Sequence, residues 1–183
     1  MTPEGRAAEF DSADPLAPYR ERFTLPDGVI YLDGNSLGAL PKATPAAVQR
    51  VVEQEWGEGL IRSWNSAGWF DMASRIGGKI APLIGANPHE VIACDSTSVN
   101  LFKLIAAALQ MRPGRKVVLS EPRNFPTDLY MIAGLEAQGL ATRRLAERDR
   151  LAAALDGDVA LLMLTHAHYK TGALFDMTTL TRA

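Results

Sequence analysis

The sequence predicts an α/β fold, a mainly parallel sheet in a three-layer arrangement with helices on both faces, preceded by an N-terminal helical and loop segment. In the second half of the chain, short apolar runs of strand length alternate with longer helical patterns. Three of these runs are apolar at every position or at all but the last, which is typical of strands buried on both faces. The predicted strands are Val91–Cys94, Val117–Ser120, Ala141–Leu145 and Val159–Thr165.

Composition limits the class of protein and its partners. The 183 residues are enough for a domain with a real core. A net charge of −2, with acids and bases interspersed, predicts no nucleic-acid or anionic-membrane partner. The one cysteine, Cys94, excludes an internal disulfide and favours a reducing compartment. No apolar run approaches the roughly 20 residues of a membrane span, and no signal-peptide pattern is seen, so we expect a cytoplasmic protein.

The chain before the predicted sheet is organised differently. Residues 1–14 are polar and are expected to be a flexible N-terminus, residues 15–87 a helical and loop segment, and residues 88–183 the α/β domain. Helical spacing is clear over Ala46–Trp56 and again over Phe70–Ile84. The second of these helices contains two adjacent glycines, each of which weakens it by about 1 kcal/mol relative to alanine.

Two stretches of this first segment are candidates for ligand contact. The glycine-rich loop Asp33–Gly38 lets the backbone approach a ligand closely, although an ordinary turn has the same composition. The stretch Leu60–Phe70 carries Trp64 and Trp69 among small polar residues, with neither a strand nor a helix period. Such aromatic rings either line a flat apolar site or pin the segment to the core or to a second subunit.

The stretch from Val91 to Leu109 is the strongest local signal in the sequence. An apolar run meets Asp95, Ser96, Thr97 and Ser98, and a long helical pattern follows, which predicts a strand that leads into a helix N-terminus. Free amides, hydroxyl groups and the helix dipole favour an anion there. Neither GxxxxGK[ST] nor GxGxxG is present, so a single phosphate monoester fits better than a nucleotide. Simple helix capping is the alternative.

Three polar loops follow predicted strands, and parallel sheets bind ligands at that edge. Phe125, in the second loop, either stacks on a flat cofactor or serves as a hydrophobic staple. His166 and His168, in the third, are candidate metal ligands. Only one other histidine and no cysteine or carboxylate cluster accompany them, so we predict no metal. The three loops are Asp95–Ser98, Ser120–Asp128 and Thr165–Gly172.

Five motifs, in order and in register, carry a family resemblance. They are YLDGNSLG (Tyr31–Gly38), GLIRSWNSAGW (Gly59–Trp69), DSTSVNLFK (Asp95–Lys103), NFPTDLY (Asn124–Tyr130) and LTHAHYKTG (Leu164–Gly172). Together they resemble the kynureninases, pyridoxal-phosphate enzymes of the fold type I aminotransferase group. The resemblance implies the N-terminal part of such an enzyme, with an incomplete fold type I large domain over residues 88–183.

The resemblance implies an activity, a cofactor and a set of binding residues. The activity is hydrolysis of a carbon–carbon bond in L-kynurenine, or in its 3-hydroxy form, giving anthranilate or 3-hydroxyanthranilate and L-alanine, in tryptophan degradation and NAD biosynthesis. The cofactor is pyridoxal 5′-phosphate, and the full-length enzyme is expected to be a homodimer. The implied cofactor-binding residues are Thr97, Ser98, Phe125, Pro126, Thr127, Asp128 and Thr171, with Ser36 and Trp64 on the substrate side.

The sequence also departs from the family pattern. His168 stands where we expect asparagine. The lysine that forms the Schiff base is not expected among residues 1–183, so we predict no catalytic residue in this chain and no activity from it alone. The alternatives are another enzyme of the group, such as a cysteine desulfurase-like lyase, and a non-catalytic fragment. Phe125 argues against the former, whose usual stacking residue is histidine.

Overall fold

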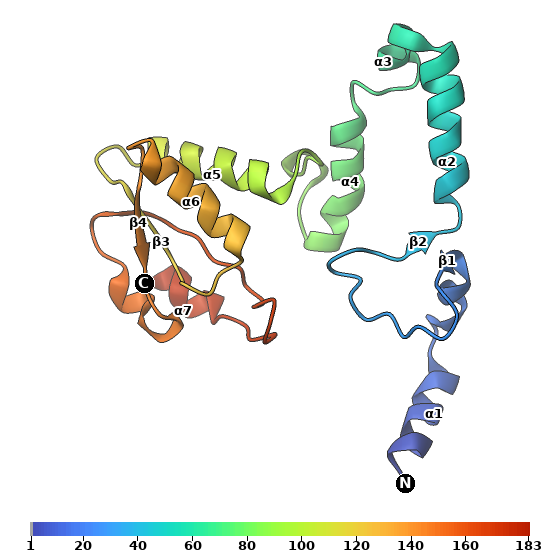
Figure 1. Cartoon of the computed structure of the whole chain (residues 1–183), viewed down its shortest axis with the longest axis horizontal. Helices are drawn as coiled ribbons and strands as arrows, with labels where there is room; N and C mark the ends of the chain where they lie inside the picture. Colours follow the sequence, from blue (N-terminus) through green and yellow to red (C-terminus); the bar gives the residue numbers. More distant parts are fainter. Residues whose placement is uncertain (1) are drawn as a thin grey trace. The chain divides into compact units, whose positions relative to one another are not determined.

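The computed structural model describes residues 2–183, which divide into two compact units (Figure 1). One unit ends at Ile92 and the other spans Ala93–Ala183. Within the described residues, every helix is too short or too polar to cross a membrane. Each unit has its own architecture.

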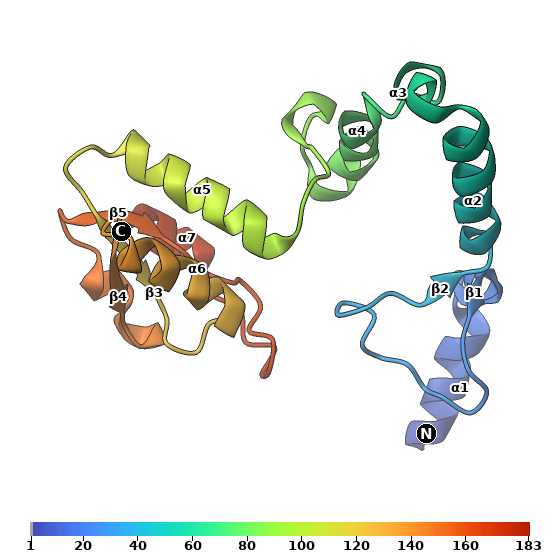
Figure 2. The same cartoon turned by 45° about the horizontal axis from the view of Figure 1, so that its top comes forward.

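The second unit is built on a three-stranded parallel sheet with the strand order β4-β3-β5. Its strands are β3 (Val117–Ser120), β4 (Thr142–Leu145) and β5 (Val159–Leu162). Figure 2 shows the long helices α5 and α6 lying together beside the sheet. The helices are α5 (Thr97–Met111), α6 (Pro126–Ala137) and α7 (Met177–Arg182), with short 3-10 turns η5 (Arg148–Arg150) and η6 (Ala152–Ala154).

Both faces of this sheet are covered, because alternate residues of the central strand point into two separate clusters. Val118 packs with Ile105 of α5 and Ile132 of α6. Val117 and Leu119 instead pack in a second cluster that includes residues of η6 and α7. The structure therefore confirms an α/β arrangement with a parallel sheet, whose central strand is buried on both faces.

The predicted strand Val91–Cys94 is wrong. Val91 has an extended backbone, with φ −122° and ψ 129°, but the segment pairs with no strand. Ile92 is 62% exposed. An apolar extended segment becomes a strand only where a partner offers the matching hydrogen bonds, and the described residues provide none for this one. The last predicted strand is also shorter than expected, since β5 ends at Leu162.

The first unit is a series of short helices with one small two-stranded antiparallel sheet. The helix α1 covers most of residues 1–14, capped by Thr2, and all its side chains are exposed; the flexibility expected there stays a prediction. The elements are α1 (Pro3–Ala13), η1 (Ala17–Arg22), β1 (Phe23–Thr24), β2 (Leu40–Pro41), α2 (Thr44–Arg50), the π-helix η2 (Val51–Glu58), η3 (Leu60–Arg62), α3 (Ser63–Ser66), α4 (Met72–Ile84) and η4 (Pro88–Glu90).

The two glycines inside α4 have different surroundings. Gly77 is buried, and a Cβ added there would overlap the backbone carbonyl of Val91. Gly78 has room, since an added Cβ would meet only Pro88 Cβ, at 3.7 Å. Gly77 therefore allows the chain after α4 to pass directly against the helix.

We expect Gly77→Ala to destabilise the protein by about 1–3 kcal/mol, because the methyl group overlaps backbone that must move. Gly78→Ala is the matched control and is expected to stabilise α4 by about 0.5–1 kcal/mol through helix propensity. Urea unfolding followed by circular dichroism at 222 nm measures both. Equal effects of the two substitutions would contradict the close approach at Gly77.

Candidate functional site

A buried hydrogen-bond network ties together the carboxyl ends of β3 and β5. The Ser120 hydroxyl is fully buried, donates to the carbonyl of Met163 at 2.8 Å and accepts from Asn124 Nδ2 at 3.1 Å. The Thr165 hydroxyl donates to Asn124 Oδ1 at 2.7 Å. Ser120 and Met163 are 43 residues apart in sequence, and Asn124 and Thr165 are 41 apart. The network therefore fixes the position of the loop after β3 against the loop after β5.

The same asparagine begins α6. Asn124 Oδ1 accepts the amide of Phe125 at 2.7 Å, and the Phe125 carbonyl accepts the amide of Asp128 at 3.0 Å. Pro126 occupies the first helical position, where its missing amide costs nothing. The Phe125 ring is 42% exposed and packs edge-to-face on Tyr169, with ring centres 4.9 Å apart. The sequence allows Phe125 either to stack on a cofactor or to serve as a hydrophobic staple, and its ring is exposed enough to stack on a further flat group.

Asp128 is a buried carboxyl group in the first turn of α6. Burial raises the pKa of Asp128 above its usual value of 3.8, while hydrogen bonds from Thr165 and Thr127 oppose that shift. The Thr165 hydroxyl lies 3.4 Å from Asp128 Oδ2. The ionised carboxylate is thus held at the helix N-terminus, which favours negative charge, at a cost in desolvation.

The start of α5 presents unused hydrogen-bond donors. Ser96 is the N-cap and its hydroxyl accepts the amide of Val99 at 3.4 Å. The amides and hydroxyls of Thr97 and Ser98 form no hydrogen bond within the described residues. The predicted helix start at these residues is confirmed, although no strand precedes it. The first-turn amides of a fifteen-residue helix suit an anion.

The turn before α5 is held from the helix itself. Asp95 has a left-handed backbone, with φ 50°, and forms an ion pair with Lys103 two turns along the helix. The hydrogen bond within this ion pair lowers the pKa of Asp95 and raises the pKa of Lys103. Asn100 Nδ2 donates to the Cys94 carbonyl at 2.8 Å. These contacts hold the turn before α5 against the helix.

Both views of the second unit show α5 and α6 running side by side in the same direction, so their N-termini lie at the same end (Figures 1 and 2). The loop after β5 also lies at that end. The start of α5 and the loops after β3 and β5 therefore face the same side of the unit, as the sequence interpretation expected for the edge of a parallel sheet.

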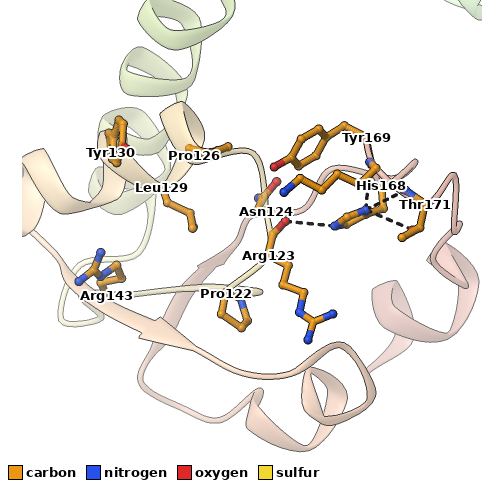
Figure 3. Close-up of a pocket in the computed structure, with 11 residues that line it drawn as sticks. Pro122, Arg123, Asn124, Pro126, Leu129, Tyr130, Arg143, His168, Tyr169 and Thr171 are labelled. Carbon is orange, nitrogen blue, oxygen red and sulfur yellow. Dashed lines mark hydrogen bonds between the residues drawn. The ribbon is translucent and has the colours of Figure 1, made fainter.

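A pocket of about 580 Å³ opens between the loops after β3 and β5 (Figure 3). Two of the predicted cofactor residues, Pro126 and Thr171, line it. Thr97, Ser98 and Phe125 do not. The predicted cofactor set is thus divided between this pocket and the helix starts beside it.

The His168 side chain, on the loop after β5, forms its hydrogen bonds mainly with backbone groups. His168 Nδ1 faces the amides of Lys170 and Thr171, and its Nε2 lies 3.2 Å from the Arg123 carbonyl. Within residues 2–183 the structure contains no group of three or more histidine, cysteine or acidic side chains placed to hold a metal ion.

The predicted substrate-side residues belong to the first unit. Ser36 donates to Asp33 Oδ1 at 2.7 Å within the glycine-rich loop. Trp64 is 49% exposed and packs edge-to-face on Trp69, whose indole nitrogen donates to Glu55 Oε2 at 2.7 Å. The tryptophan stretch forms short helices, not the irregular segment expected, because buried Ser63 anchors it to the Glu55 carbonyl at 2.5 Å.

Sequence reasoning missed a charged cluster behind the loop after β5. Glu121 is 3% exposed, and one of its carboxylate oxygens has no hydrogen-bond partner. Arg148 lies 3.9 Å from that oxygen, stacks 3.5 Å over the Phe175 ring and donates to the Ala173 carbonyl at 3.1 Å. Glu121, Arg148 and Phe175 are too far apart in sequence for a local pattern to relate them, so the sequence gives no signal for this cluster.

The chain is homologous to curated kynureninases over its whole length. It is 50% identical to the kynureninase of Pseudomonas fluorescens over an alignment of 188 residues, which covers 99% of this chain and 45% of that protein. It is 51% identical to the kynureninases of Burkholderia mallei and Burkholderia pseudomallei, over 100% of this chain and 45% of each relative. No protein-family model matches. The chain thus spans a little under half the length of these relatives, and the resemblance seen in the five motifs is confirmed.

The buried carboxyl group predicts a pH-dependent stability. Below about pH 3.9 Asp128 is protonated in both the folded and unfolded states; as pH rises through its raised folded pKa, ionisation costs stability. We expect Asp128→Asn to be no more stable than the wild type near pH 3.5 and to gain in relative stability toward pH 7. Thermal unfolding at several pH values measures this, with exposed Asp149→Asn as control. A difference between Asp128→Asn and the wild type that does not change with pH would contradict it.

Proposed function

We propose that this chain, a homologue of kynureninases along its entire length, carries part of the pyridoxal 5′-phosphate site of a kynureninase. The observation that carries the proposal is the pairing of this homology with open hydrogen-bond donors at the start of α5. The proposal includes the fold type I architecture, of which the parallel sheet of the second unit would be one part.

The residues present fit the cofactor chemically. A phosphate monoester needs several donors and a positive environment, and Thr97 and Ser98 offer two amides and two hydroxyls at a helix N-terminus. A pyridine ring needs a flat apolar surface, which the partly exposed Phe125 ring supplies. When bound, the cofactor supplies an electron-withdrawing ring that takes up charge as bonds at the substrate α-carbon break.

The chain's own residues would bind and orient the cofactor. Thr97 and Ser98 would hold the phosphate, while Phe125 would stack on the ring. Pro126, Thr127 and Asp128 would complete that wall, and the network through Asn124 keeps the wall fixed to the sheet. Thr171, on the loop after β5, would lie nearest the polar edge of the ring.

The substrate, partners and chemistry of the whole enzyme belong to the same proposal. The reaction proposed is hydrolysis of L-kynurenine to anthranilate and L-alanine in a homodimer, with Ser36 and Trp64 on the substrate side. The first unit exposes many large apolar side chains that a second copy could cover, among them Trp56, Ile61, Phe70 and Leu83. We propose that none of the five lysines forms the bond to the cofactor, so that residues 1–183 have no activity by themselves.

The phosphorus-31 spectrum of pyridoxal 5′-phosphate tests the phosphate position directly. We expect residues 1–183 to broaden or shift the signal with roughly millimolar affinity, because a few charge-assisted hydrogen bonds, each about 1.5–3 kcal/mol, barely exceed association costs of at least about 4 kcal/mol. The double variant Thr97→Ala/Ser98→Ala should abolish the effect, and exposed Thr178→Ala should not.

Two results would overturn parts of the proposal. Equal phosphorus-31 effects in the double variant and the wild type would remove the phosphate site from the start of α5. Anthranilate fluorescence that develops on addition of kynurenine, or a visible absorption band of the cofactor that survives dialysis, would show that a lysine in this chain serves after all.

A further inference from the structure

The pocket between the loops after β3 and β5 has a strongly biased charge. Arg123, Arg143 and Lys170 line it, and no acidic residue does. Arg143 has a partner outside the pocket, since its Nε lies 3.6 Å from Glu136. Arg123 and Lys170 form no ion pair with any residue in the described part of the chain. Such a concentration of one charge in a concave site attracts anions.

Beside three uncharged or weakly basic polar residues, Asn124, His168 and Thr171, the lining contains apolar and aromatic side chains. Leu129 and the rings of Tyr130 and Tyr169 contribute, together with two prolines (Figure 3). Lys170 Nζ lies 5.4 Å from the centre of the Tyr169 ring, so a cation and an aromatic surface adjoin. The volume of about 580 Å³ is within the usual range for small-molecule sites. Flat apolar walls with cations beside them suit a planar molecule that carries a carboxylate.

His168 holds the two walls of the pocket together. Its Nδ1 lies 3.3 Å from the amides of both Lys170 and Thr171, and an amide can only donate. Nδ1 is therefore the acceptor, and Nε2 carries the proton that it donates to the Arg123 carbonyl at 3.2 Å. The loop bearing Lys170 is thus joined to the loop bearing Arg123.

We propose that this pocket binds a small aromatic carboxylate through Arg123 and Lys170, at a position separate from the phosphate position at the start of α5. The separation follows from the lining, which excludes Thr97, Ser98 and Phe125. The phosphate position and the choice of a natural ligand rest on the proposed function: anthranilate, the aromatic product of that reaction, is such a carboxylate.

Titration of anthranilate fluorescence with residues 1–183 tests the pocket. We expect saturable binding that weakens at least tenfold in Arg123→Gln/Lys170→Gln and less than twofold in the control Arg150→Gln, whose side chain is 77% exposed. Benzoate should displace anthranilate at least tenfold more effectively than benzamide, its neutral counterpart. This comparison uses the wild type alone, so it holds even if a variant fails to fold.

Three results would overturn the inference. Binding unaffected by the double substitution would mean that anthranilate binds elsewhere. Displacement by inorganic phosphate as effectively as by benzoate would make the pocket a general anion site. Competition by pyridoxal 5′-phosphate that Thr97→Ala/Ser98→Ala does not remove would make it part of the cofactor site. Failure of the proposed function gives a different result, in which the phosphorus-31 effect is absent while anthranilate still binds.

Discussion

The hydrogen bonds of the Asn124 side chain are the constraint on which the second unit depends. Its amide nitrogen donates to buried Ser120 in the central strand, and its oxygen accepts from Thr165 and from the amide that begins α6. One side chain therefore joins two strand ends to a helix start. Leaving such buried groups without partners costs about 1–3 kcal/mol each, so the loops at this edge are tightly determined.

Much of the second unit could be predicted from its sequence, because the signals are local. The apolar run at Val117–Ser120, the proline at the first turn of α6 and the polar residues before α5 each correspond to an observed boundary. Val91–Cys94 has the same apolar signal and forms no strand. Its apolar composition shows only that the segment would be suited to burial. Whether it forms a strand depends on a pairing partner, which its own residues do not specify.

The candidate site was predictable only in part. The motifs indicate Phe125, Asp128 and Thr171, and the structure places the first two at the start of α6 and the third on the loop after β5, where neighbouring Tyr169 packs on Phe125. The charges of the pocket were not foreseen, since Arg123 and Arg143 acquire a common role only when β4 pairs with β3. The tautomer of His168 was also beyond reach, because it follows from backbone amides and not from the residue type.

The parallel order β4-β3-β5 also bears on how the unit folds. β4 joins β3 across α6 alone, whereas β5 pairs with β3 only after the chain has passed through α6, β4 and two short turns. The longer closure carries the larger entropy cost, so β5 is expected to dock after β4. Thr165 and His168 follow β5, so their contacts to the β3 loop would form late. Substitutions there should chiefly speed unfolding and leave the rate of folding nearly unchanged.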